Sequence, residues 1–182
     1  MNRRAAELGM TRTRFVTPNG LTYGKGPHDT TTARDVAKLS VALCRFPEAL
    51  KYTGTKQYIL RRPGKPLELL NHNHLLDSFP GCDGLKTGWT VAAHASIVTT
   101  AKDKDLRVIA VVLGCQSPAG AKPEQRLRDS LAADLMAQGL AKLKKLEAEK
   151  ALQLAQTPAR KAPVKAKKHE GFWDWLVDLF SF

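Results

Sequence analysis

The sequence predicts an α/β fold in which an antiparallel sheet is flanked by helices. Three segments rich in strand-favouring residues, 84–90, 96–101 and 106–114, follow one another through short turns, as in a hairpin extended by a third strand. Helical patterns lie on both sides of them in the chain, at residues 30–44 and 123–138. The 182 residues, 43% of them hydrophobic, suffice for one packed domain plus a tail.

Capping residues mark the helices that precede these strands. Residues 2–9 have the pattern of a helix end, with Gly9 as the C-cap. Residues 17–21, Thr-Pro-Asn-Gly-Leu, are typical of a turn. A helix is expected over residues 30–44, because threonines precede it and Asp35 stands in its first turn.

The expected strands differ in hydrophobicity. Residues 53–70 are polar and interrupted by prolines, and only Gln57–Leu60 is expected as a weak strand. Residues 106–113, in contrast, are nearly all apolar after Arg107. Such a run predicts a central strand that is covered on both faces.

The last helical pattern begins at Pro123, because proline is favoured in the first turn of a helix. It runs to Gln138, and Gly139 is expected to stop or interrupt it before helical character resumes over residues 140–156. We expect its apolar face to pack on the core, through Leu127, Leu131, Leu135 and Met136.

The net charge of +12 is concentrated near the C-terminus. Residues 141–170 contain nine Lys or Arg against three Glu, which gives +6, half of the total. A charged helix and basic linker of this kind either stays solvated or binds an anionic partner, such as membrane headgroups or a cell-wall polymer. The domain has no nucleic-acid recognition motif, so no nucleic-acid partner is predicted.

Residues 171–182 combine three Phe and two Trp with Asp174 and Asp178, which share one helix face. This pattern is typical of an amphipathic helix that lies in a membrane interface, and the alternative is a tail packed on the domain or on a partner. No run of about 18 apolar residues occurs, so no segment is expected to span a bilayer. The N-terminal residues lack the apolar region of a signal peptide.

Cysteines and histidines give no metal-binding pattern. Cys44, Cys82 and Cys115 have no metal-ligand spacing and cannot all pair, so we expect free, buried or half-buried thiols. His72 and His74 lack a third ligand at a suitable spacing. No metal site and no cofactor is predicted.

The motif most specific for one chemistry is Lys86-Thr87-Gly88. Lys-Thr-Gly is one of three motifs of serine acyl-transferases that act on D-Ala-D-Ala peptides and penicillins. The other two, Ser-x-x-Lys and Ser-x-Asn, do not occur, because no serine has Lys three residues later or Asn two residues later. A lysine-activated serine needs its base one helical turn away, so no catalytic residue is predicted in this chain.

The order of motifs resembles the serine-type D-Ala-D-Ala carboxypeptidases, which are the low-molecular-mass penicillin-binding proteins. Seven segments carry the resemblance in register: residues 1–10, Thr13-x-Phe15, Pro18-x-Gly20-Leu21, Thr32–Asp35, Asn71-x-Asn73-x-Leu75-Leu76, Asp83–Thr90 and Arg126…Leu135…Gly139-Leu140. The resemblance implies a β-lactamase/penicillin-binding-type α/β fold. It also implies that the chain is truncated at its N-terminal side, because Met1-Asn2 corresponds to an internal position of the family, downstream of both serine motifs.

The same resemblance implies a role for each residue of the motif strand. Lys86 would place positive charge near the free carboxylate of the terminal D-Ala, and Thr87 would donate its hydroxyl to that carboxylate. Gly88 would let the substrate backbone approach closely. The backbone N–H of Trp89 would be an oxyanion donor, and Thr90 would hydrogen-bond beside the substrate carboxylate. Outside this family context, an exposed strand lysine beside a threonine is the alternative reading.

Other residues near the motif have expected supporting roles. Asn71 and Asn73 are expected to hold a turn before the motif strand, and Arg126 to anchor the final helix against the sheet. His94 departs from the family pattern, which has a small residue, often glycine, at this position.

The implied activity is acyl transfer in peptidoglycan maturation, with stem peptides ending in D-Ala-D-Ala as substrate and β-lactams as ligands of the full-length family. The implied place of action is the extracytoplasmic face of the inner membrane. We expect a partial catalytic domain at 1–140, a charged helix and basic linker at 141–170, and a candidate membrane anchor at 171–182. Because the serine motifs are missing, the chain is expected to be inactive alone; the alternative function is a non-catalytic peptidoglycan- or membrane-binding remnant.

Overall fold

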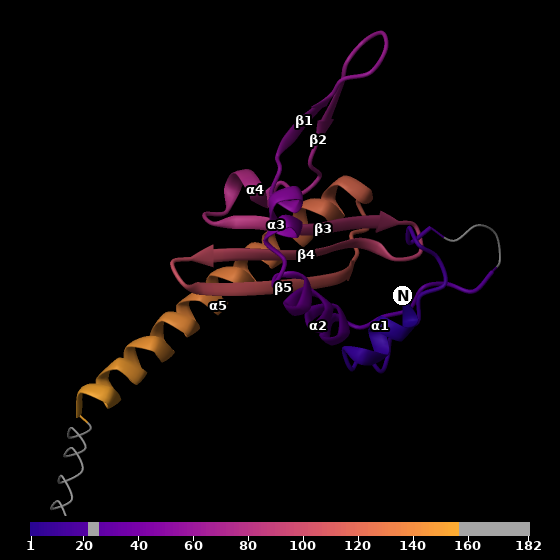
Figure 1. Ribbon diagram of the computed structural model, residues 1–182. Coiled ribbons are helices and arrows are strands. Elements are labelled where there is room, and N and C mark those ends of the chain that lie inside the picture. Colours follow the sequence, from indigo (N-terminus) through magenta and orange to yellow (C-terminus); the bar gives the residue numbers. More distant parts are fainter. Residues whose placement is uncertain (22–25, 157–182) are drawn as a thin grey trace, which may run out of the picture. The chain divides into compact units, whose positions relative to one another are not determined.

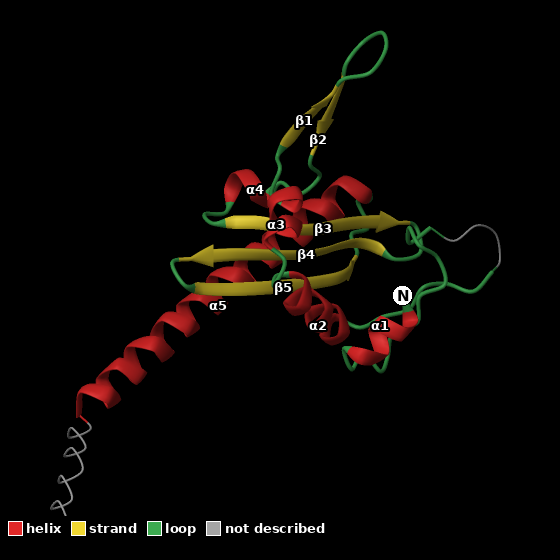
Figure 2. Cartoon of the chain, in the orientation of Figure 1, coloured by secondary structure: helices red, strands yellow, loops and turns green. Residues whose placement is uncertain are grey.

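The computed structural model of this protein describes residues 1–21 and 26–156 (Figure 1). It has the predicted α/β character, with antiparallel strands and flanking helices (Figure 2). The elements in chain order are α1 (Asn2–Glu7), α2 (Ala33–Leu43), α3 (Pro47–Thr53), β1 (Gln57–Leu60), β2 (Leu67–Leu70), α4 (Leu75–Ser78), β3 (Cys82–Thr90), β4 (His94–Asp103), β5 (Leu106–Cys115) and α5 (Ala121–Gln156).

The chain divides into two units, Met1–Leu146 and Glu147–Phe182. The first unit contains all the strands named above, and in the second the structure describes residues 147–156, which end α5. No helix within residues 1–21 and 26–156 is long and apolar enough to cross a membrane. The expected anchor at 171–182 and the linker from residue 157 onward lie outside the described residues.

The larger sheet has the strand order β3-β4-β5, so β4 is its central strand. Ile97 of β4 pairs with Thr87 of β3 on one side and with Val112 of β5 on the other. The prediction that residues 106–113 form a central strand is therefore wrong for the described chain, in which β5 lies at an edge. The apolar run reflects the cover that α2 and α5 give to the two faces of β5, and face burial does not specify how many neighbours a strand has.

The hydrophobic core lies between the sheet and α5. Its buried side chains are Leu75, Ile97, Ala101, Val108, Ala110, Ala132 and Met136. Gly139 does not interrupt α5, contrary to the prediction, because α5 is continuous through it. A Cβ at Gly139 would lie 3.1 Å from a methyl carbon of Val108, so this glycine lets the helix approach β5 closely.

The face of α5 that packs on the sheet differs from the predicted leucine face. Glu124, Arg128, Ala132 and Met136, spaced four residues apart, are its buried residues. Leu127, Leu131 and Leu135 are exposed, so of the predicted set only Met136 lies in the core. Both sets have helical spacing, and hydrophobicity alone favoured the wrong one.

The N-terminal segment is fixed to α2 through Asp35. The Thr32 hydroxyl accepts a hydrogen bond from the backbone N–H of Asp35 (3.2 Å), which confirms the predicted threonine cap. The buried Asp35 carboxylate then accepts hydrogen bonds from the backbone N–H of Arg12 and the hydroxyl of Thr13, both at 2.9 Å. One carboxylate therefore joins the turn after α1 to the start of α2.

The weak strand that the sequence predicted is one half of a second sheet, a two-stranded hairpin. β1 at Gln57–Leu60 pairs antiparallel with β2 at Leu67–Leu70, a strand that the polar, proline-containing sequence did not indicate. The cysteines are free thiols: Cys44 and Cys82 are half-buried and Cys115 is buried.

Candidate functional site

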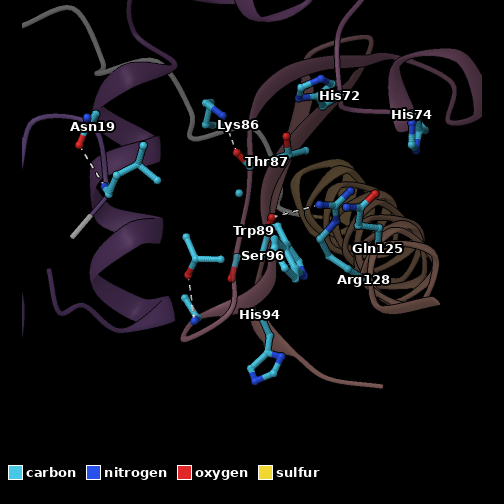
Figure 3. Close-up of a pocket in the computed structure, with 15 residues that line it drawn as sticks. Asn19, His72, His74, Lys86, Thr87, Trp89, His94, Ser96, Gln125 and Arg128 are labelled. Carbon is cyan, nitrogen blue, oxygen red and sulfur yellow. Dashed lines mark hydrogen bonds between the residues drawn. The ribbon is translucent and has the colours of Figure 1, made fainter. Parts of the chain in front are cut away.

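A pocket of about 720 Å³ lies along the second half of β3 (Figure 3). All five residues proposed from the motif, Lys86, Thr87, Gly88, Trp89 and Thr90, line it. The other walls come from distant parts of the chain: Asn19, Gly20, Leu21, His72, His74, Ala93, His94, Ser96, Gln125 and Arg128. The fold thus brings the motif strand together with the predicted turn at 17–21 and the first turns of α5.

The start of β3 is held by polar contacts from three directions. The Arg107 guanidinium forms a bidentate ion pair with the Asp83 carboxylate, with both nitrogen–oxygen distances at 2.7 Å. The carbonyl of Gly84 accepts hydrogen bonds from the side-chain amide of Asn73 (3.1 Å) and from the hydroxyl of Thr99 (2.8 Å). The residues just before Lys86 are therefore fixed, which gives the motif a rigid base.

Asn71 and Asn73 hold the turn before β3, as predicted. The amide nitrogen of Asn71 donates to the carbonyls of Thr53 (3.1 Å) and Thr55 (2.9 Å). Its amide oxygen accepts from the backbone N–H of Asn73 at 2.9 Å. Asn73 in turn reaches Gly84, so this turn also positions the motif strand.

Gly88 faces open space on the pocket side of β3. A Cβ built on Gly88 would meet no heavy atom within 4 Å, and its φ does not lie in the left-handed region. Neither packing nor backbone conformation within the described chain therefore requires glycine at this position. The open space is available to a ligand that approaches the strand backbone.

Arg128 is a pocket residue that the sequence analysis missed. Its side chain is 3% exposed and lines the pocket from α5. Nε and Nη2 donate to one carboxylate oxygen of Asp129, at 2.9 and 2.7 Å, and Nη1 donates to the Ser96 carbonyl at 3.4 Å. The predicted anchor of the helix, Arg126, is exposed, so Arg128 takes that part instead. No local feature of the sequence marked Arg128, because its spacing four residues before Ala132 is informative only once Ala132 is known to be buried.

Glu124 is a second residue that the sequence analysis missed. It is buried, and its carboxylate accepts hydrogen bonds from the Trp89 indole N–H at 2.7 Å and from Nδ1 of His94 at 2.9 Å. The Trp89 hydrogen bond is the main cause that holds the pKa of Glu124 below its ordinary value; burial opposes it and His94 adds to it. His94 has a φ of 52°, in the left-handed region that non-glycine residues rarely adopt.

Groups that could hold a metal ion or attack a carbonyl are few in the described pocket. No set of three or more His, Cys, Asp and Glu residues in 1–21 and 26–156 is arranged for a metal ion. Nδ1 of His74 lies 3.2 Å from a carboxylate oxygen of Asp129, and His72 is a further lining residue of the pocket (Figure 3). Ser96 is the one serine among the lining residues of this described pocket, and its Oγ accepts a hydrogen bond from the backbone N–H of Gly114.

The chain is similar to known proteins in both sequence and fold. Residues 1–117 match the family described as D-alanyl-D-alanine carboxypeptidase. The chain is 38% identical over 119 residues to the D-alanyl-D-alanine carboxypeptidase DacF of Bacillus subtilis, and 38% identical over 119 residues to DacC of Escherichia coli. These matches cover 65% and 64% of this chain but only 30% and 28% of the relatives, so the chain spans about three tenths of their length.

Solved structures share the fold. Penicillin-binding protein D2 of Listeria monocytogenes, solved with cefotaxime bound, is 33% identical with a TM-score of 0.64, over 76% of this chain and 53% of that one. The Streptomyces K15 DD-transpeptidase is 28% identical with a TM-score of 0.64, over 77% of this chain and 52% of that one. The chain therefore belongs to the D-alanyl-D-alanine carboxypeptidase family and has the corresponding part of the penicillin-binding fold.

Proposed function

We propose that this chain supplies the carboxylate-binding side of a serine-type D-Ala-D-Ala carboxypeptidase site that acts in peptidoglycan maturation. The observation that carries the proposal is the open pocket along β3, where Lys86, Thr87 and Gly88 share one cavity with the buried Arg128. Two cationic side chains beside a hydroxyl and an unhindered strand backbone suit a peptide that ends in a free carboxylate.

Each lining residue has a defined part in this proposal. The Lys86 ammonium and the Thr87 hydroxyl bind the carboxylate of the terminal D-Ala, and Arg128 adds positive charge from the far wall. The substrate backbone lies along β3 over Gly88. The backbone N–H of Trp89 donates to the oxygen that becomes negative during acyl transfer, and Thr90 hydrogen-bonds beside the carboxylate.

The family reaction needs a serine nucleophile in addition. Its hydroxyl oxygen bonds to the carbonyl carbon of the penultimate D-Ala, the peptide bond breaks, and the terminal D-Ala leaves with a proton on its amine; water then hydrolyses the ester. These 182 residues contain neither Ser-x-x-Lys nor Ser-x-Asn. We propose that the chain alone binds such substrates without forming an acyl-enzyme.

Two measurements test this proposal. N-acetyl-Lys-D-Ala-D-Ala should bind saturably in a calorimetric or NMR titration, and its C-terminal amide should not, because the amide removes the carboxylate. A fluorescent penicillin should leave no covalent band on the denatured chain, with an intact carboxypeptidase of the family as positive control. Equal binding of acid and amide would refute the carboxylate site, and a covalent band would refute the absence of acylation.

The alternative, a non-catalytic wall- or membrane-binding protein, is favoured by the composition of the C-terminal region. Residues 141–170 carry a charge of +6, and residues 171–182 contain five aromatic side chains. We propose that residues 171–182 anchor the chain on a membrane on the extracytoplasmic side, where enzymes of this family act on the cell wall. Sedimentation with vesicles of anionic phospholipid should be lost on deletion of residues 157–182, whereas binding that survives the deletion would assign it to the domain.

A further inference from the structure

The buried face of α5 changes character along its length. Ala132 and Met136 belong to the apolar core, whereas Arg128 and Glu124, one and two turns before Ala132, are charged and yet nearly fully buried. Burial of a charge is costly unless hydrogen bonds compensate it. The hydrogen bonds of these two residues therefore show which parts of the sheet α5 fixes near the pocket.

Glu124 joins both strands at the end of the β3–β4 hairpin to the helix. Oε2 accepts from the indole N–H of Trp89 in β3, and Oε1 accepts from Nδ1 of His94 in β4 and, at 3.4 Å, from the backbone N–H of Ser117. Thr90 pairs with His94 in the strand register, so the two side chains that Glu124 holds stand on either side of the hairpin turn.

This strand end is also held by its pairing with β4 and by the hydrogen bond from the Ala93 N–H to the Thr90 hydroxyl (3.0 Å), but its pocket side has few side-chain contacts. Gly88 has no side chain and meets no neighbour on that side, and Trp89 is 42% exposed. His94 keeps a left-handed backbone conformation that costs free energy for a non-glycine residue. The hydrogen bond to Glu124 helps to maintain that conformation, and with it the geometry of the turn.

We propose that Glu124 is a positioning residue for the substrate-binding strand. By fixing the Trp89 side chain, it sets the direction of the Trp89 backbone N–H and the path of the neighbouring Gly88. The inference rests on the proposed function for its consequence, ligand binding, but its structural part can be tested without any ligand.

The first test observes the free protein by ¹H–¹⁵N NMR. The chain has three tryptophans, and Trp89→Phe identifies the Trp89 indole resonance because that signal disappears. Glu124→Gln should move this indole resonance upfield and should shift the backbone amides of Gly88, Trp89 and Thr90. Glu48→Gln, an exposed glutamate in α3, is the matched control and should move none of them.

The second test measures binding of N-acetyl-Lys-D-Ala-D-Ala. Glu124→Gln and Trp89→Phe, which keeps the aromatic ring but loses the donor, should each raise the dissociation constant about tenfold, as expected for loss of a charge-assisted hydrogen bond. The double variant should have a dissociation constant no higher than that of the weaker-binding single variant, because both changes remove the same interaction.

The outcomes separate this inference from the proposed function. If the wild-type chain does not bind the tripeptide, the proposed function fails, and the amide shifts still decide the role of Glu124. If Glu124→Gln only lowers the unfolding temperature while the amides of 88–90 and the dissociation constant stay unchanged, Glu124 is merely structural and the inference is wrong. If Glu124→Gln does not fold, the Trp89→Phe variant decides the inference through the amide shifts of residues 88–90 and the dissociation constant. This variant is expected to fold, because it leaves the buried Glu124 carboxylate paired with His94.

Discussion

Three glycines in or next to β3 serve different purposes. A Cβ at Gly81 would lie 2.1 Å from the carbonyl oxygen of Lys102, and one at Gly84 would lie 2.4 Å from the hydroxyl of Thr53. Both positions also have φ in the left-handed half of conformational space. Gly88 has neither constraint, so its small size is of use only to something outside the described chain.

Substitution of Gly88 should separate binding from stability. We expect Gly88→Val to leave the free energy of unfolding, measured in urea, within about 0.5 kcal/mol of wild type, because the new side chain enters open space and valine favours strands. Binding of N-acetyl-Lys-D-Ala-D-Ala should fall at least tenfold, because the side chain occupies the approach to the strand.

Gly81→Val is the matched control for this prediction. Its side chain would collide with the Lys102 carbonyl, so it should destabilise the fold by several kcal/mol. If Gly88→Val binds the tripeptide as wild type does, the ligand does not lie over this strand.

At the scale of elements, the sequence predicted the strands better than the packing of the helices. Strands β3, β4 and β5 were expected within a few residues of their ends, because alternating or apolar runs and short turns mark them. The same pattern could not tell that β5 lies at an edge. Likewise Gly139 reads as a helix stop in isolation, and only its neighbour Val108 explains why a glycine continues the helix.

In the site too, the sequence predicted some residues and missed others. Lys86, Thr87 and Gly88 were found because they form a contiguous motif that carries its chemistry in the sequence. Glu124 and Arg128 stand about 40 residues later, and nothing local connects them with β3. Their charges also argued against burial, so the leucines of the same helix were chosen for the core face.

The two faces of α5 can be distinguished by a pair of matched truncations. Met136→Ala should lower the free energy of unfolding by about 2–5 kcal/mol, because Met136 is fully buried against β4 and β5. Leu131→Ala should change it by less than about 0.5 kcal/mol, because Leu131 is exposed and alanine is an equally good helix former. Urea unfolding of both variants measures the difference, and a larger loss at Leu131 would show that the leucine face is covered in solution.

At the scale of the whole molecule, carboxylates connect segments that are distant in the chain. Asp35 joins the N-terminal turn to α2, Asp103 of β4 pairs with Lys144 of α5 at 2.7 Å, and Glu124 joins α5 to the hairpin end. Asp29 accepts from the hydroxyl of Thr17 and from two backbone N–H groups. The attachments between elements therefore depend on side chains that must stay ionised.

All four carboxyl groups have pKa values below their ordinary values in the folded protein. Hydrogen bonds from Thr17 lower the pKa of Asp29, and those from Lys144 and Trp89 lower the values of Asp103 and Glu124. For Asp35, burial acts to raise the pKa, but hydrogen bonds from Arg12, Thr13 and Lys38 together outweigh it.

These shifts predict the pH dependence of stability. A carboxyl group with a lower pKa in the folded than in the unfolded state stabilises the fold fully above the unfolded value, and this stabilisation is lost as the pH falls through the folded value. The unfolded values here are 3.8 for Asp and 4.5 for Glu. The free energy of unfolding should therefore stay nearly constant from about pH 7 to about pH 5 and fall steeply below about pH 4.

Asp35→Asn tests whether loss of these carboxylate hydrogen bonds causes the fall in stability at low pH. The variant should be less stable than wild type at pH 7, because the amide cannot replace a carboxylate that accepts from Arg12, Thr13 and Lys38. Its stability should then decline less between pH 5 and pH 3, so that the two curves converge in acid, where Asp35 is protonated in both states. Urea midpoints at constant ionic strength measure both curves, with Asp105→Asn, in the exposed turn between β4 and β5, as the control. Parallel curves for wild type and Asp35→Asn would mean that repulsion among the excess positive charges of the chain, rather than loss of these hydrogen bonds, drives unfolding in acid.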